Sequence, residues 1–237
     1  MNVIETNNLT KKFGDLTAVN NVTLSIKKGE LFGLLGPNGS GKTTMIKMLT
    51  GQIKPTNGSS KILNVNVLTN PIKVRELVGI IPEQETPPSF LTAEEYLDFV
   101  GKIRKINNIT EKSNKWFKLL DFKDQKNVLC KDLSRGTRQK LMVAQAFLHE
   151  PQLAFIDEPL INLDPIIQRT LKDFLLDYIK KGNTVFFSTH VLEIAEEVCT
   201  QIGVIDKGRL LHQGPITELK KKKQHLEDFF LKLVKEG

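Results

Sequence analysis

The sequence predicts an α/β protein with a parallel sheet at its core and a mostly helical insert. Three apolar runs, at residues 30–36, 153–156 and 184–187, have the length and composition of buried strands. Stretches of helix-forming residues follow the first run and separate the other two, which is the order of parallel βαβ units. A chain of 237 residues is long enough to bury such a core unaided.

The first apolar run, ELFGLLG, is expected to be a strand that leads through a glycine-rich loop into a helix. The residues before it consist of short β-rich segments separated by turns. The stretch KTTMIKMLTG, residues 42–51, contains helix formers and ends at Gly51, a residue type that often closes helices. This part of the chain therefore predicts a strand, a loop and a helix in direct succession.

Residues from about 85 to 150 form the predicted helical insert. Thr92 and Glu95 have the spacing of a capping box, which marks the start of a helix. The apolar residues that follow share one helical face, namely Tyr96, Leu97, Val100 and Ile103. The stretch EKSNKWFKLLDF continues the helical pattern, and we expect it to bury Trp116, Leu119 and Leu120.

Composition limits the class of protein. Hydrophobic residues make up 40% of the chain and no apolar run approaches the roughly 18 residues that cross a bilayer. The N-terminus lacks the apolar stretch of a secretory signal, so we expect a cytoplasmic protein. Cys130 and Cys199 have no metal or redox spacing and are expected to be packing residues.

The net charge of +7 is compatible with nucleic acid, with an anionic membrane surface, or with an ordinary solvated surface rich in lysine. The only marked charge run is KKKK, residues 220–223, which is expected to be a solvated helix face or a contact with lipid headgroups. Charge alone therefore leaves the partner open.

The stretch GPNGSGKTT, residues 36–44, matches the phosphate-binding pattern G-x-x-x-x-G-K-[ST]. Its glycines let the backbone direct N–H groups at phosphate oxygens, and the following helix N-terminus adds its dipole. Lys42 supplies a cation at the β- and γ-phosphates, and Thr43 supplies a hydroxyl to Mg²⁺. The expected phosphate-binding residues are Gly36, Pro37, Asn38, Gly39, Ser40, Gly41, Lys42, Thr43 and Thr44.

Two acidic residues follow the second apolar run. Asp157 comes at the predicted end of the strand, where a carboxylate can hold the Mg²⁺ shell, and Glu158 is placed to polarise an attacking water as general base. His190 ends the third strand at the same edge of the sheet, where ligands bind in open α/β sheets. We expect His190 to contact the γ-phosphate.

The turn DLSRGTRQK, residues 132–140, has no acid–base pair but begins a helix. Ser134 is a suitable N-cap, and Gly136 leaves backbone N–H groups uncovered, so this helix start is a second candidate anion site. The chain already has one phosphate loop at 36–44. A second phosphate-binding turn on the helical insert therefore suggests that a second molecule completes the site.

The order of the motifs GPNGSGKTT, LSRGT, FIDEP, LDP and STH resembles the ATPase subunit of an ABC transporter, over essentially the whole chain. The resemblance implies a P-loop NTPase fold, with a RecA-like mixed sheet, N-terminal antiparallel strands and a helical subdomain. It further implies one domain over 1–237, with a core at about 1–84 and 151–237 and a helical subdomain at about 85–150.

The resemblance also assigns residues. Phe13 matches the aromatic that stacks on adenine, Val19 would line the same face, and Asp164 matches an acid that communicates between two sites. VGIIPEQ, residues 78–84, matches the loop that joins the lobes and senses Mg²⁺. At its end the family's usual glutamine is replaced by Glu83, with Gln84 one place later, so either of them is the candidate metal-sensing residue.

Other positions depart from the family pattern as well. Arg135 and Thr137 replace the usual third and fifth residues of the signature turn, and Ile161 stands where a serine is common. The residues expected to perform the chemistry, Lys42, Asp157, Glu158 and His190, are all present. The sequence therefore favours a competent ATPase.

The resemblance implies that ATP and Mg²⁺ are bound in a head-to-tail dimer with a second copy or a paralogous ATPase subunit. A transmembrane permease subunit would use the resulting motion at the inner face of the membrane, and the C-terminal LEDFFLKLVKEG resembles exporter-type subunits. The alternative interpretation of that segment is an amphipathic helix that closes the core. One alternative function is an ABC-type ATPase acting on nucleic acid or ribosomes. Such proteins usually carry two cassettes in one chain, coiled-coil arms or zinc fingers, and the sequence shows none of these and no interleaving of aromatic and basic residues. Another alternative, a soluble P-loop kinase, leaves LSRGT unexplained.

Overall fold

Two sheets form the framework of the computed structural model, which describes all residues except 85–86, 159–162, 222–224 and 237. The larger sheet has the order β11-β10-β4-β9-β8-β7, and only β11 runs antiparallel to its neighbour. Its strands are β4 (Leu31–Leu35), β7 (Val78–Ile81), β8 (Leu153–Asp157), β9 (Thr184–Thr189), β10 (Gln201–Asp206) and β11 (Arg209–Pro215). The three predicted strands are confirmed as β4, β8 and β9, side by side at its centre.

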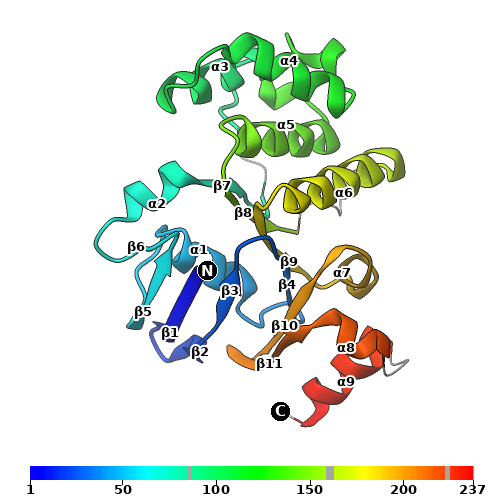
Figure 1. Cartoon of the computed structure of the whole chain (residues 1–237). Coiled ribbons are helices and arrows are strands. Elements are labelled where there is room, and N and C mark those ends of the chain that lie inside the picture. The colour runs from blue at the N-terminus through cyan, green and yellow to red at the C-terminus, as the bar shows by residue number, and fades with distance from the viewer. Residues whose placement is uncertain (85–86, 159–162, 222–224, 237) are drawn as a thin grey trace.

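The central strands consist of apolar runs because both of their faces are covered. Every residue of β4, β8 and β9 is buried. One face packs into a core shared with the helices α3 to α7, and the other packs into a core shared with the smaller sheet and the first helix. Figure 1 shows the helices on both sides of this sheet.

The smaller sheet is antiparallel and comes mainly from the N-terminal residues. Its strands are β1 (Asn2–Phe13), β2 (Leu16–Val22), β3 (Ser25–Lys27), β5 (Asn57–Ile62) and β6 (Val65–Asn66). β1 lies between β2 and β5 and also pairs with β3. The expected N-terminal antiparallel strands are thereby confirmed.

The helices are α1 (Lys42–Leu49), α2 (Pro71–Leu77), α3 (Ala93–Ile103), α4 (Ile109–Leu119), α5 (Arg135–Phe147), α6 (Pro165–Lys180), α7 (Leu192–Val198), α8 (Ile216–Lys221) and α9 (Leu226–Glu236). The capping box of α3 is formed: the Thr92 hydroxyl accepts from the Glu95 N–H, and the Glu95 carboxylate accepts from the Thr92 N–H. Gly51 follows α1 with a φ of 67°, and its N–H donates to Met48 O, so its role as a helix terminator is confirmed.

The described residues between 87 and 150 contain α3, α4, α5 and two short 3₁₀ helices, Lys123–Gln125 and Cys130–Asp132. Figure 1 shows α3, α4 and α5 together above the larger sheet. Their apolar side chains belong to the same continuous core as one face of that sheet. The exact division of the chain into two lobes stays a prediction.

Leu119, which was expected to be buried, and Ile103, which was expected on the apolar face of its helix, are both exposed. Leu119 is 41% exposed because the buried stripe of α4 passes through Ser113, Trp116 and Phe117, and Leu119 lies about 100° round the helix from Leu120. Ile103 is 64% exposed because it ends α3 and faces a cavity opposite α2. The two cysteines are buried packing residues, as expected.

The C-terminal helix α9 contributes to the core. Leu226 is buried, and Phe229 and Phe230 pack against the same cluster as α7. This supports its interpretation as an amphipathic helix that closes the core. The side chains of the lysine run 220–223 lie outside the described residues.

Candidate active site

The glycine-rich loop lies between the end of β4 and the start of α1. A Cβ at Gly36 would come 2.3 Å from the carbonyl oxygen of Ile205, and one at Gly41 would come 2.4 Å from the carbonyl oxygen of Ala18. Gly41 also has a φ of 108°, which residues with a side chain rarely adopt. Because Ile205 is in β10 and Ala18 in β2, the loop is fixed where the two sheets meet.

The ammonium group of Lys42 lies inside this loop. Its Nζ donates to the carbonyl oxygens of Gly36 at 2.8 Å and Pro37 at 3.2 Å, and Glu158 Oε1 is 3.8 Å away. Burial lowers the pKa of Lys42, while the carboxylates of Glu158, Asp157 and Glu83 act in the opposite direction. The cation is thus held by carbonyl oxygens that phosphate oxygens can replace.

Asp157 ends β8 in a buried position beside Thr43. The parallel register pairs Asp157 with Ser188, whose hydroxyl donates to the carboxylate. Burial raises the pKa of Asp157; the Ser188 and Thr43 hydroxyls oppose this, and the neighbouring carboxylates of Glu83 and Glu158 add to it. Thr43 Oγ1 is also 3.4 Å from Glu83 Oε2. Thr43, Asp157 and Glu83 therefore form a cluster of oxygen donors.

Glu158 is held in place by two neighbours from the end of β9. Its Oε1 lies 2.8 Å from Nδ1 of His190, and its Oε2 accepts from the Thr189 hydroxyl at 3.4 Å. Its backbone has a φ of 53°, a conformation that is uncommon without glycine and that is found at functional sites. The structure brings the three candidate catalytic residues together, with Glu158 between Lys42 and His190.

An open cavity of about 390 Å³ covers Lys42 and Glu158, while His190 is not among the residues that line it. The residues that line it are Phe13, Leu16, Ala18, Asn38, Gly39, Gly41, Lys42, Thr43, Thr44, Glu83 and Glu158. Ser40 is buried beneath it, where its carbonyl accepts from the Gly208 N–H. Apolar side chains, the glycine loop and the acidic edge of the sheet thus share one depression.

The expectation for Val19 is wrong. Val19 is fully buried, and a Cβ on Gly41 would meet its Cγ2 at 3.3 Å, so it packs beneath the loop. Leu16 and Ala18, from the same strand, line the cavity in its place. The reason is the alternation of β2, whose inward-facing residues belong to the core.

Residues 78–84 do not form one loop. Residues 78–81 are the edge strand β7, and only Pro82, Glu83 and Gln84 follow it. Glu83 lines the main cavity and also a neighbouring one of about 270 Å³, whereas Gln84 lines only the smaller one, together with Asp157. Glu83 is therefore the residue that reaches both Thr43 and the main cavity.

The serine turn lies at the N-terminus of α5. Ser134 caps this helix: its Oγ accepts from the Thr137 N–H at 3.1 Å and is 2.9 Å from the Thr137 hydroxyl. Ser134 is exposed, and neither Ser134 nor Gly136 is among the residues that line the main cavity. Within one chain, the glycine loop and the serine turn therefore do not share a cavity.

Asp164 caps α6, since its Oδ1 accepts from the Ile167 N–H at 3.0 Å. Its Oδ2 lies 3.9 Å from Nζ of Lys140, in the second turn of α5. The helix that begins at the serine turn is thereby linked to the helix that follows Glu158. The position of Ile161 lies outside the described residues.

Ser188 and Thr189 are site residues that the sequence analysis did not identify. Both are buried, and each binds one of the two acidic residues at the end of β8. The motif STH could have identified them. When β8 and β9 pair as parallel neighbours, the residues just before His190 lie beside the residues at the end of β8.

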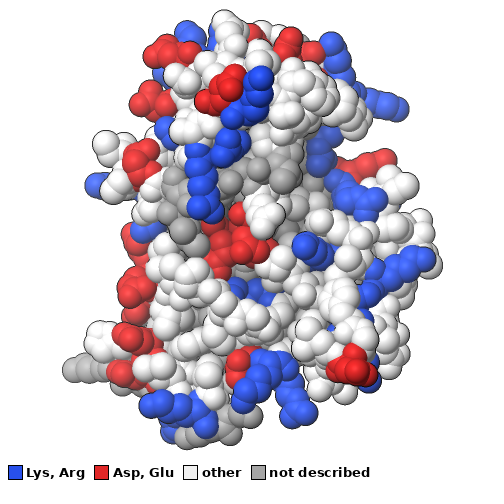
Figure 2. Space-filling model, turned by 180° about the vertical axis from the view of Figure 1, so that it is seen from behind, with Lys and Arg blue, Asp and Glu red and all other residues white. Residues whose placement is uncertain are grey.

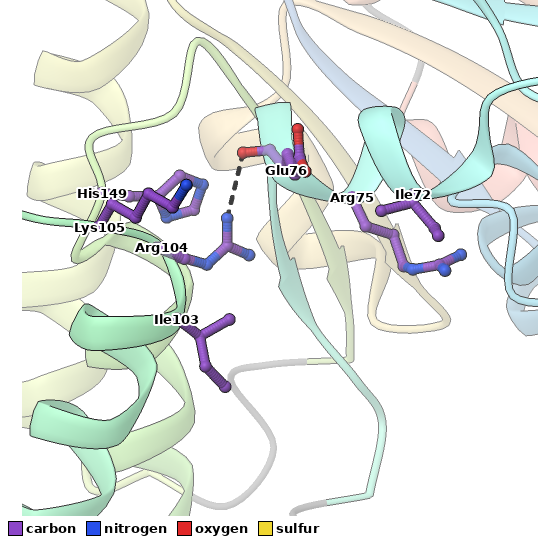
Figure 3. A pocket seen from close by; sticks show the side chains of 7 residues that line it. All are labelled: Ile72, Arg75, Glu76, Ile103, Arg104, Lys105 and His149. Atoms are coloured by element: carbon purple, nitrogen blue, oxygen red, sulfur yellow. Dashed lines mark hydrogen bonds between the residues drawn. The ribbon is translucent and has the colours of Figure 1, made fainter.

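A second cavity, of about 490 Å³, lies between α2 and the end of α3 (Figure 3). The Arg104 guanidinium donates to the carbonyl oxygens of Glu76 at 3.2 Å and Val78 at 3.4 Å. Arg75, on α2, donates to Gly51 O at 2.8 Å. Burial, with the charge of Arg104, lowers the pKa of His149 in this cavity to about 4.

The described residues contain no group of three His, Cys, Asp or Glu side chains arranged to hold a metal ion. Among them, no helix combines the length and the apolar character needed to span a membrane.

Comparisons with known proteins agree on a family. The family model described as ABC transporter matches residues 19–161. The chain is 36% identical over 229 residues to the bacitracin transport ATP-binding protein BcrA of Enterococcus faecalis, covering 96% of this chain and 74% of that protein. It is 32% identical to the Nod factor export ATP-binding protein I of Cupriavidus metallidurans, covering 92% and 72%. It also matches the probable multidrug ABC transporter ATP-binding protein YbhF of Escherichia coli at 34% identity, covering 92% of this chain but 38% of that protein.

Solved structures agree. An ATP-binding subunit of an ABC transporter superposes with a TM-score of 0.90 at 26% identity, covering 98% of this chain and 99% of that one. A bacterial ABC transporter cassette solved as a dimer superposes with a TM-score of 0.84 at 25% identity, covering 90% and 98%. The predicted fold class, with its antiparallel N-terminal sheet and mixed core sheet, is confirmed.

Proposed function

This chain belongs to the ABC transporter family as an ATP-binding ATPase subunit, and from that premise we propose how it works and what it serves. Two copies, or this chain and a paralogous subunit, bind MgATP head to tail, hydrolyse it and separate. A separate transmembrane subunit at the inner face of the membrane uses this motion to export a substrate. The observation that carries the proposal is that Glu158 contacts both Lys42 and His190, and that Lys42 and Glu158 line the main cavity.

Each of these residues has a definite task. The backbone N–H groups of the glycine loop and the Lys42 ammonium bind the β- and γ-phosphates, and Lys42 exchanges its contacts with Gly36 and Pro37 for phosphate oxygens. Glu158 orients the attacking water and accepts its proton, and the contact with His190 sets the direction of the carboxylate. His190 then steadies the transferred phosphoryl group.

The donor set at the end of β8 fits Mg²⁺. Thr43 and Asp157 offer the hydroxyl and carboxylate oxygens that this ion prefers, and Glu83 lies 3.4 Å from the Thr43 hydroxyl. Burial raises the pKa of Asp157, and the carboxylates of Glu83 and Glu158 add to this effect; a divalent cation would favour the charged form of all three. When bound with the phosphates, Mg²⁺ neutralises the charge that develops on the transferred group.

The separation of the two phosphate-binding turns supports the dimer. Ser134 begins a helix of 13 residues whose uncovered N–H groups suit an anion, yet the turn is exposed and away from its own chain's main cavity. In a head-to-tail pair, the Ser134 turn of one copy covers the nucleotide on the Lys42 loop of the other. One related cassette was solved as a dimer in two structures, one of them with ADP and Pi.

The second cavity supports a docking place for the transmembrane subunit. Its apolar residues Ile72 and Ile103 are 66% and 64% exposed, although nothing in one chain requires exposed isoleucines there. Arg75 joins the cavity to the end of the glycine-loop helix at Gly51. Arg104 joins it to Val78, where the strand that leads to Glu83 begins. A segment inserted between α2 and α3 would therefore contact Arg75 and Arg104, which are bonded to the end of the glycine-loop helix and to the start of β7.

Export is favoured by the relatives, whose names refer to bacitracin transport, multidrug transport and Nod factor export. The nucleic-acid alternative finds little support on the face of the molecule that Figure 2 shows. In Figure 2, Lys and Arg side chains form separate groups between white and acidic areas rather than one continuous basic stripe.

The test is to purify the tagged chain from detergent-solubilised membranes of its own cells. We expect a polytopic membrane protein to accompany it, and we expect Ile103→Asp to reduce that recovery strongly. Leu119→Asp is the matched control, because Leu119 is also an exposed residue at a helix end but does not line the cavity. Recovery of ribosomal RNA instead of a membrane protein would contradict the proposal.

A further inference from the structure

Phe13 lies at the tip of a hairpin where little else restrains it. It ends β1 and pairs with Leu16 across a turn at Gly14 and Asp15. Half of its surface is exposed, and it lines the main cavity together with the glycine loop. A ring this exposed needs a further contact if it is to keep one orientation in the absence of a ligand.

Lys11 provides that contact. Its Nζ lies 4.9 Å from the centre of the Phe13 ring, within the range of a cation–π interaction. The same Nζ donates to the carbonyl oxygen of Lys54 at 2.8 Å. The ammonium group is therefore fixed on one side by the backbone and meets the ring on the other.

The anchor is part of the nucleotide-binding framework. Lys54 lies between α1, which the glycine loop begins, and β5. The same connection is held to β1 by two more hydrogen bonds, from the Lys12 N–H to the Thr56 hydroxyl at 2.9 Å and from the Thr56 N–H to Thr10 O at 2.8 Å. The position of the Phe13 ring is thus tied to the helix that carries Lys42.

We infer that Lys11 is a positioning residue for the nucleotide base. Its ammonium group covers one face of the Phe13 ring and fixes the ring's orientation, so that the base stacks on the opposite face. This inference rests on the proposed binding of ATP in the main cavity and goes beyond it, since it assigns the recognition of the base to a pair of residues. Lys11 itself does not touch the nucleotide.

Lys12 is a matched control on the same strand. It is a neighbouring lysine with an exposed side chain, and its contact with Thr56 is made by its backbone N–H. Lys12→Met therefore removes the same charge as Lys11→Met but leaves the contact with Phe13 intact. Lys11→Arg keeps a cation for the ring.

The experiment compares MgADP with magnesium pyrophosphate in calorimetric titrations of the full chain, because pyrophosphate has the phosphates but no base. Lys11→Met is expected to weaken ADP binding about three- to tenfold, from the loss of a cation–π contact and of the ordered ring. Pyrophosphate binding is expected to stay unchanged, Lys12→Met to match the wild type, and Lys11→Arg to restore most of the ADP affinity. In a Phe13→Ala background, Lys11→Met is expected to have no further effect.

Equal weakening of ADP and pyrophosphate would overturn the inference, because Lys11 would then act on the phosphate loop. The inference would also be overturned if Lys11→Met weakened ADP binding as strongly in the Phe13→Ala background as in the wild type. This second criterion requires titrations with ADP only. A wild-type chain that binds no ADP at all would instead overturn the proposed function.

Discussion

The glycine loop and the serine turn are both phosphate-binding turns at the N-terminus of a helix, but they differ in their surroundings. The loop at 36–41 is enclosed by both sheets, and Lys42 and Glu158 meet beside it within one chain. The turn at Ser134 is exposed, and among the described residues its hydroxyl is hydrogen-bonded to Thr137. The candidate catalytic residues Lys42 and Glu158 thus lie beside the glycine loop and not beside the serine turn. The difference indicates that each chain contributes two unequal halves of a site.

The largest expected effect sharpens the role of the enclosed half. Glu158→Gln keeps the size of the side chain but removes the general base, so turnover should fall by about a hundredfold or more. ATP affinity should stay close to that of the wild type, because the phosphate contacts of the glycine loop are unchanged. Steady-state ATPase assays and nucleotide titrations measure both quantities. Unchanged turnover would remove Glu158 from this role.

The exposed half is tested by Ser134→Ala. We expect turnover to fall about ten- to a hundredfold, since a phosphate contact is lost in the closed dimer. Loss of the helix cap should lower stability by only about 1 kcal/mol. Thr92→Ala is the matched control, because it removes the same type of cap from α3 on the same helical part of the chain. If Thr92→Ala reduced turnover as strongly as Ser134→Ala, the effect would be structural and the two-halves interpretation would be wrong.

The smallest expected effect concerns the junction between α3 and the sheet, at His149. Its pKa of about 4 lies below the ordinary value near 6.5, so between these pH values the unfolded chain binds more protons than the folded one. Stability should therefore fall as the pH drops from 6.5 to 4, by about 2 kcal/mol from this group after allowance for partial solvent screening.

Denaturant unfolding at several pH values measures this dependence. His149→Gln should flatten the curve in that range, whereas His225→Gln, at an exposed histidine, should leave it unchanged. Arg75, Glu76, Arg104 and Lys105 line the cavity with His149, and the charge of Arg104 adds to the effect of burial on its pKa. If the free energy of unfolding changed with pH equally in His149→Gln and the wild type, the stability of this junction would not depend on a neutral imidazole at position 149.

The sequence predicted the elements whose residues act through local patterns. The three central strands, the loop that Gly36 begins and the caps at Thr92 and Ser134 depend on neighbours in the chain, and each was identified. Side chains that depend on tertiary packing were less predictable. Val19 is buried whereas Leu16 lines the cavity, because the side chains of β2 alternate between its two faces and one face packs on the core. Ile103 is exposed because α3 ends above a cavity.

Contacts between distant parts of the chain could not be predicted from the sequence for a related reason. Ser188 meets Asp157, and Lys11 meets Lys54, only after strands far apart in the chain have paired in a definite register. The choice between Glu83 and Gln84 likewise required the position of β7 at the sheet edge, which directs Glu83 towards Thr43.

The measurement that tests the central claim most directly is the mass of Glu158→Gln in solution, by light scattering with and without saturating MgATP. If nucleotide is enclosed by the loop of one chain and the serine turn of another, this variant should be monomeric without nucleotide and dimeric with it. Adding Ser134→Ala should return it to the monomer. A Glu158→Gln chain that binds MgATP yet stays monomeric, both alone and with a paralogous subunit, would contradict the account.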